Sequence, residues 1–206
     1  MIRIELDGRI RRLRLAAPER HNIIDAAMSL RLLEELKEAE ADAATGSILI
    51  EAEGPMFCGG ASNDVDPGIF QLGVQSTKPI VAAVQGVALG AGLALIAGAH
   101  VAIAAQGSSF GFVDIREGRW NEELFQVLSR CMGARRALEL GLTGRIFTAP
   151  DALSWGLLHS IAPAFELDDR ATAMAQALAS ADARALRAAL AGRRGTGVQP
   201  VTPLTS

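Results

Sequence analysis

The stretch PIVAAVQGVALGAGLALIAGAHVAIAA, residues 79–105, decides the fold, and it contains no Asp, Glu, Lys or Arg. Its length would suffice to cross a bilayer. It opens, however, with the β-branched run 80–84, and residues 101–105 form a second run of the same kind, each followed by Gln-Gly. Such runs are typical of buried strands, which leaves room only for a short helix near 91–99. We therefore predict strand, short helix and strand, and no membrane span.

A third copy of this strand unit lies upstream, at ILIEAEG, residues 48–54. All three units are continuously apolar and end in a polar residue and a glycine. Continuously apolar strands belong to sheets covered on both faces, usually parallel sheets joined by crossovers. The repetition of strand, glycine turn and connector predicts a layered or spiral α/β fold.

The flanking segments add further elements. Asp7-Gly8 between alternating apolar residues predicts a hairpin over 2–15, and Asn22 with Asp25 is typical of the start of a helix running to about Ala43. Beyond residue 118 the pattern is mostly helical. We expect helices over 121–132, 134–142 and 149–155, a last strand within 157–163, one or two helices over 167–192, and a disordered tail over 193–206.

Composition narrows the classes of function. The chain has 206 residues, 50% of them hydrophobic, and a net charge of −3, which gives no basic surplus for nucleic acid or anionic lipid. The N-terminus mixes charged and apolar residues, unlike a signal peptide. Cys58 and Cys131 lie far apart without CxxC or His partners, which indicates neither a disulfide framework nor zinc. A cytoplasmic location is expected.

Two glycine-rich loops follow buried strands, FCGGAS at 57–62 and GVALGAGLA at 86–94. Backbone N–H groups at a helix start stabilise negative oxygen, and glycines let a substrate approach the backbone closely. Two such N–H groups aimed at one point would make an oxyanion hole. The alternative is that these glycines only form turns between packed strands.

The order of PERHN, FCGGAS, the run Lys78–Phe112 and GARRALELGLTGRIFTAPDALSWGLLHSIAP resembles the crotonase superfamily, also called the enoyl-CoA hydratase/isomerase family. The resemblance covers about 1–163 and implies a spiral core of repeated β-β-α units over these residues. It also implies an abbreviated helical region over 164–192 and assembly as a homotrimer or dimer of trimers. The implied substrate is an acyl-CoA thioester, with no metal or redox cofactor. The resemblance places oxyanion donors at the N–H groups of Gly59 and Ala91, and substrate contacts at Phe57, Cys58, Gly60, Ala61, Gly90 and Trp120.

The sequence departs from the family pattern at its acids. The position of the first hydratase glutamate is Ala94, and the second carboxylate position falls at Val113-Asp114. Water addition needs two proton-handling groups, whereas one base is enough to move a proton between α and γ carbons. Asp114 is therefore the predicted catalytic acid. The family pattern places an additional carboxylate at Glu122 or, with a one-residue slip, at Glu123. An isomerase or hydratase activity is expected.

Two other interpretations remain open at this stage. A homologue that kept the fold and lost its acids would bind acyl-CoA without catalysis. Alternatively, GSSFG at 107–111 matches the G-x-S-x-G nucleophile elbow of serine hydrolases, with Asp114 and His159 completing a triad. That elbow requires a helix directly after Gly111, and FVDIREGRW is not typical of one.

Overall fold

The computed structural model describes residues 1–194 and begins with the predicted hairpin, β1 (Ile2–Asp7) and β2 (Ile10–Leu15), paired antiparallel. Helix α1 (Ala26–Ala41) follows, and the Asp25 carboxylate caps it by accepting the Met28 N–H at 2.8 Å. Asn22 is not part of the cap, because it adopts a left-handed backbone conformation before the helix begins. The helix ends slightly earlier than predicted.

The three apolar units form neighbouring parallel strands, as predicted. They are β3 (Ser47–Ala52), β4 (Ile80–Val84) and β6 (Val101–Ala105), and β9 (Ser160–Ala162) pairs with β6 at the sheet edge. The six-stranded sheet has the order β1-β2-β3-β4-β6-β9. A smaller sheet contains β5 (Val87–Leu89), β7 (Ser109–Gly111) and β8 (Ile146–Thr148) in the order β5-β7-β8. From β4 to β7 the chain alternates between strands of the two sheets, in the β-β-α repetition of a crotonase-like spiral.

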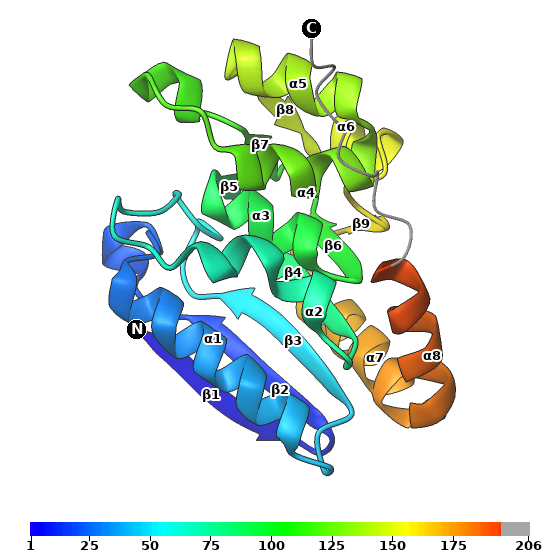
Figure 1. Ribbon diagram of the computed structural model, residues 1–206. Coiled ribbons are helices and arrows are strands. Elements are labelled where there is room, and N and C mark those ends of the chain that lie inside the picture. The colour runs from blue at the N-terminus through cyan, green and yellow to red at the C-terminus, as the bar shows by residue number, and fades with distance from the viewer. Residues whose placement is uncertain (195–206) are drawn as a thin grey trace, which may run out of the picture.

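Both faces of the large sheet are covered, which explains its continuously apolar strands. On one face Leu49, Val81 and Ile103 pack against α7 (Leu167–Ser180). On the opposite face Ile48, Ile50 and Ala82 join a larger core to which α1 and the fully buried α3 (Ala91–Gly98) contribute. Figure 1 shows α1 and α7 on different sides of the sheet. Successive strand residues thus enter different cores, and neither set contacts water.

The remaining helices follow the predicted order, except that α2 was not predicted. They are α2 (Leu72–Gln75), α4 (Glu122–Met132), α5 (Ala134–Thr143), α6 (Ala149–Ser154) and α8 (Ala183–Arg194), with short 3-10 turns η1 (Pro18–Arg20), η2 (Pro67–Gln71), η3 (Asp114–Glu117) and η4 (Ala164–Glu166). Helix α8 continues to Arg194, past the predicted end at 192, and residues 195–206 of the predicted tail lie outside the described residues. Within residues 1–194, no helix is long and apolar enough to cross a membrane.

The structure does not provide the nucleophile elbow of a serine hydrolase. Ser109 lies inside β7, and the chain reaches the η3 turn only at Asp114, so no helix begins after Gly111. The His159 ring accepts the Ala102 N–H through Nδ1 at 3.0 Å, which fixes it at the sheet edge. The serine hydrolase interpretation is therefore wrong in its central geometric requirement.

Candidate active site

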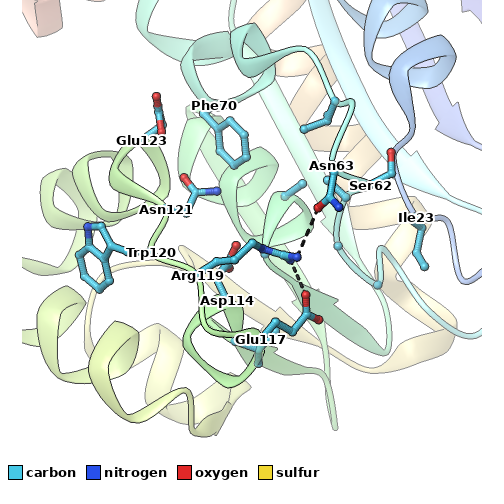
Figure 2. A pocket seen from close by; sticks show the side chains of 17 residues that line it. Ile23, Ser62, Asn63, Phe70, Asp114, Glu117, Arg119, Trp120, Asn121 and Glu123 are labelled. Carbon is cyan, nitrogen blue, oxygen red and sulfur yellow. Dashed lines mark hydrogen bonds and ion pairs between the residues drawn. The ribbon is translucent and has the colours of Figure 1, made fainter.

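A cavity of about 370 Å³ lies where three separate segments meet. They are the loop 59–65 after β3, the β5–α3 junction at Gly90 and Ala91, and the segment 113–123 before α4. Phe70 and Ile23 complete its wall. Figure 2 shows Asn63 of the first segment and Asp114, Arg119 and Asn121 of the last around a common space. A concave site of this volume is in the range used for small ligands.

Most of the predicted site residues are brought together here, although they come from distant parts of the sequence. Gly59, Gly60, Ala61, Gly90, Ala91, Asp114, Trp120 and Glu123 all line the cavity. Phe57, Cys58 and Glu122 are not among its lining residues. Each of these three differences has a physical reason.

Phe57 and Cys58 are buried beneath the cavity and are not available to a substrate. Both are fully shielded from solvent and belong to the larger hydrophobic core. The Cys58 N–H donates to the Val87 carbonyl at 3.1 Å and its own carbonyl accepts from Leu89, which ties the residue to β5. Burial raises the pKa of the Cys58 thiol to about 12. The predicted substrate contacts at these two positions are therefore wrong.

The N–H of Gly59 is already engaged. It donates to the His21 carbonyl at 2.8 Å, so the prediction that it serves as an oxyanion donor is wrong. Further along the same segment, the Ile24 carbonyl accepts from the Ser62 N–H at 2.9 Å, and the Ile24 N–H donates to the Gly60 carbonyl at 3.0 Å. In this parallel bridge between Ile24 and Ala61, the Ala61 N–H points away from Ile24. Ala61 lines the cavity, and no backbone group among the described residues accepts its N–H.

Ala91, the second predicted oxyanion donor, lies at the cavity. Gly90 takes φ +49 and ψ −112, a conformation that favours glycine, and no side chain caps the helix α3 that starts at Ala91. The first N–H groups of a helix lack intrahelical acceptors and carry the positive end of the helix dipole. Ala91 lines the cavity, so this end of α3 faces it.

Asp114 lies beside these two loops. A Cβ built on Gly90 would lie 3.7 Å from Asp114 Oδ2 and 3.7 Å from the Cα of Gly60, so the three segments are in close proximity. Asp114 Oδ2 is buried and has no hydrogen-bond partner among the described residues. Burial raises the pKa of Asp114, and its own backbone N–H and the charge of Arg119 partly offset this effect. A carboxyl group with a raised pKa at a cavity wall is typical of proton-transfer sites.

The structure distinguishes the two alternative glutamates. Glu122 turns outward, where Oε2 accepts the Trp120 Nε1–H at 2.9 Å and Oε1 accepts from Gln126 at 3.2 Å. The predicted catalytic placement of Glu122 is therefore wrong, since its carboxylate serves the surface of α4. Glu123 lines the cavity instead. Trp120 also lines it, and its ring packs against Phe112 and Phe125 with centroids 5.4 and 5.5 Å away.

Polar residues that were not predicted occupy the cavity mouth. The Arg119 guanidinium reaches across to Asn63, donating to its Oδ1 at 3.3 Å, and forms an ion pair with Glu117 (Figure 2). Asn121 lines the same space and its side chain caps α4 by accepting the Leu124 N–H at 2.9 Å. The sequence signal for Asn121 was its position just before the helical pattern of α4. Arg119 and Asn63 meet only through the fold.

The described residues do not form a cluster of metal-binding side chains. Within residues 1–194, no group of three or more His, Cys, Asp or Glu side chains is arranged to hold a metal ion. The functional groups of the residues at the cavity are carboxylates, amides, one guanidinium, the Ser62 hydroxyl, the Trp120 indole and backbone N–H groups. This set can orient a carbonyl oxygen and transfer a proton.

Known proteins share this sequence and fold. The sequence model of the enoyl-CoA hydratase/isomerase family matches residues 5–192. The chain is 33% identical over 191 residues to the rat mitochondrial enoyl-CoA hydratase domain-containing protein 3, covering 84% of this chain and 63% of that protein. It is 31% identical over 194 residues to the 1,2-epoxyphenylacetyl-CoA isomerase of Escherichia coli K12, covering 82% and 72%. The chain thus spans less than two thirds of the rat relative.

Solved structures agree. The human enoyl-CoA hydratase domain-containing protein 3 has a TM-score of 0.86 at 25% identity, covering 92% of this chain and 81% of that one. The carnitinyl-CoA hydratase of Mycobacterium avium has a TM-score of 0.84 at 27% identity, covering 97% and 82%. With the family match over nearly all of the described chain, these findings place the protein in the enoyl-CoA hydratase/isomerase family, within the crotonase superfamily.

Proposed function

We propose that the protein binds an acyl-CoA thioester and stabilises an enolate formed from it, with Asp114 transferring the proton. The observation that carries this proposal is the buried, unpartnered Oδ2 of Asp114 next to Gly90 and the start of α3. The names of two relatives, 1,2-epoxyphenylacetyl-CoA isomerase and carnitinyl-CoA hydratase, each specify a CoA-linked substrate, which supports the substrate class.

The thioester oxygen would accept hydrogen bonds from the N–H groups of Ala61 and Ala91. Ala61 replaces Gly59 in this role, because the Gly59 N–H is bonded to His21. Negative charge grows on this oxygen as the α-proton leaves, so both donors stabilise the transition state more than the ground state. Each such donor typically contributes a factor of about 10² to 10³ in rate.

Asp114 Oδ2 would accept the α-proton and return it to carbon. Removal of a proton from the α-carbon and its return at the γ-carbon completes an isomerisation with a single base. Hydration requires a second group to handle water, and Ala94 is a buried alanine in α3. Glu117 and Glu123 line the cavity together with Asp114. Glu117 forms an ion pair with Arg119, so Glu123 is the candidate for that second role.

The test is exchange of the α-protons of butyryl-CoA in D₂O, followed by NMR. Every reaction that passes through the enolate exchanges these protons, whichever product follows. We expect exchange in the wild-type protein and a loss of at least about 10²-fold in Asp114→Asn. Glu122→Gln is the matched control, since it makes the same chemical change on a carboxylate outside the cavity.

The result also separates the alternatives. Thioester binding without exchange in the wild-type protein would support a non-catalytic acyl-CoA-binding homologue. Absence of binding would contradict the proposal as a whole. A homotrimer or dimer of trimers and independence from metal or redox cofactors belong to the same proposal and follow from the sequence resemblance. A cytoplasmic location also belongs to it and follows from the composition and the two isolated cysteines.

A further inference from the structure

Asn22 is a buried polar residue that the chemistry above does not use. It is fully shielded from solvent and adopts φ 51, directly after His21 at φ 55. Left-handed backbone is unusual for residues other than glycine, and asparagine is among those that tolerate it best. Two consecutive residues of this kind reverse the chain direction between Pro18–Arg20 and α1.

The side chain of Asn22 joins this turn to the segment that leads into the cavity loop. Its Oδ1 accepts the Ala17 N–H at 2.8 Å. Its Nδ2 donates to the Glu53 carbonyl at 2.9 Å and to the Met56 carbonyl at 2.8 Å. A buried amide with three such bonds is rigidly oriented, because breaking any one leaves a polar group unsatisfied.

The backbone on either side of Asn22 is also hydrogen-bonded to the cavity loop. His21 accepts from the Gly59 N–H, and Ile24 bonds both to the Gly60 carbonyl and to the Ser62 N–H. These bonds hold one edge of the loop against residues 21–24. The Ala61 N–H lies on the opposite edge, toward the cavity.

We infer that Asn22 is a positioning residue for the Ala61 N–H, acting through the turn 21–24; this inference rests on the proposed function. The residue touches no substrate. It fixes the turn 21–24, which pairs with the loop 59–62. This pairing determines which N–H groups of the loop are hydrogen-bonded to the turn and which one faces the cavity. Loss of the side-chain bonds releases the loop and misaligns one oxyanion donor.

The variant to test is Asn22→Gly, which keeps the left-handed backbone accessible and removes the side-chain bonds. Its control is Asp25→Ala, which removes the cap of α1 and the ion pair with Arg20 but none of the bonds that residues 21–24 make to the loop. Both variants lower stability, so measurements are made under conditions where each is folded. We expect Asn22→Gly to slow butyryl-CoA exchange by about 10- to 100-fold, up to the loss of one donor, while Asp25→Ala stays near the wild-type rate.

A readout independent of turnover is the carbonyl stretch of bound, ¹³C-labelled butyryl-CoA in infrared difference spectra. Hydrogen bonds from Ala61 and Ala91 weaken the C=O bond and lower its frequency. We expect Asn22→Gly to lose a large part of this shift while its affinity for the thioester changes less than about threefold, because the donors act mainly on the developing charge. The pH at which exchange reaches half its maximum should not move, since Asp114 is on another segment.

The outcomes distinguish the two proposals. A carbonyl shift in the wild-type protein without exchange would refute enolate chemistry and leave the role of Asn22 supported if Asn22→Gly reduces the shift. Exchange and carbonyl shift that are equal in Asn22→Gly and Asp25→Ala would overturn the Asn22 inference and leave the proposed function intact. No shift in the wild-type protein on thioester binding would overturn both.

Discussion

Gly92 rests directly against Cys58: a Cβ built on this glycine would lie 2.7 Å from the Cys58 Cβ and 2.9 Å from its carbonyl oxygen. Gly92 belongs to the first turn of α3, and Cys58 lies at the base of the cavity loop. This contact sets how closely the two loops approach. Ala61 and Ala91, which come from these two loops, line one cavity.

Gly92→Ala is expected to destabilise the protein and to slow α-proton exchange. The added methyl group meets the Cys58 Cβ and carbonyl at distances that require movement, and overpacking of this kind typically costs about 1–3 kcal/mol. Urea denaturation measures the first effect and NMR exchange the second. Gly98→Ala is the control in the same helix, because its nearest neighbour would be 3.6 Å away. Equal stabilities of the two variants would contradict the packing argument.

Cys58 is expected to resist alkylation in the folded protein. Its pKa of about 12 leaves about one thiolate in ten thousand at pH 8, and the side chain is fully buried. Mass spectrometry after iodoacetamide treatment should find the peptide containing Cys58 unmodified. The same peptide should be modified after unfolding in urea. Rapid labelling of the native protein would show that the loop opens.

Asp114→Asn is expected to raise stability at neutral pH, by about 1 kcal/mol, as it removes a buried carboxylate with an unpartnered oxygen. The pKa of Asp114 is raised from 3.8, so the folded state holds its proton to higher pH than the unfolded state. The wild-type protein therefore loses stability as the pH rises from about 3.8 through the raised value, and the loss is constant above it. Urea titrations at several pH values should show that the stability of Asp114→Asn relative to the wild-type protein increases over this pH range. An equal increase in stability at pH 3, where Asp114 is protonated, would contradict the attribution of this effect to the buried carboxylate.

Glu123→Gln and Glu122→Gln are expected to differ in their effect on turnover. Glu123 lines the cavity, whereas Glu122 bonds to Trp120 and Gln126 on the surface. If the reaction includes water addition, Glu123→Gln should slow it by about 10²-fold, in the range of a lost general acid or base. Exchange of α-protons should change less than about threefold in either variant. Hydration of crotonyl-CoA, followed by loss of its enoyl absorbance, measures the difference.

Much of the fold could be predicted from local pattern. Strands β4 and β6 and the short helix α3 could be predicted within residues 79–105, because both faces of the large sheet are buried and such burial requires continuous apolar runs. The hairpin at Asp7-Gly8 and the helix starts at Asp25 and Asn121 depend on nearby residues alone. The small sheet β5-β7-β8 was not predicted, since three-residue strands carry too little pattern to detect.

The sequence by itself indicated the family and the loops that form the cavity, and it singled out Asp114, which lines that cavity. Only the tertiary structure decided which groups in those loops are available. The Gly59 N–H is bonded to His21, nearly forty residues earlier, and the alternation of that pairing turns Ala61 toward the cavity instead. Likewise, Glu122 and Glu123 are neighbours in sequence, yet successive residues of a helix point about 100° apart. The direction of an N–H or a carboxylate depends on contacts between distant segments, and a local pattern does not contain them.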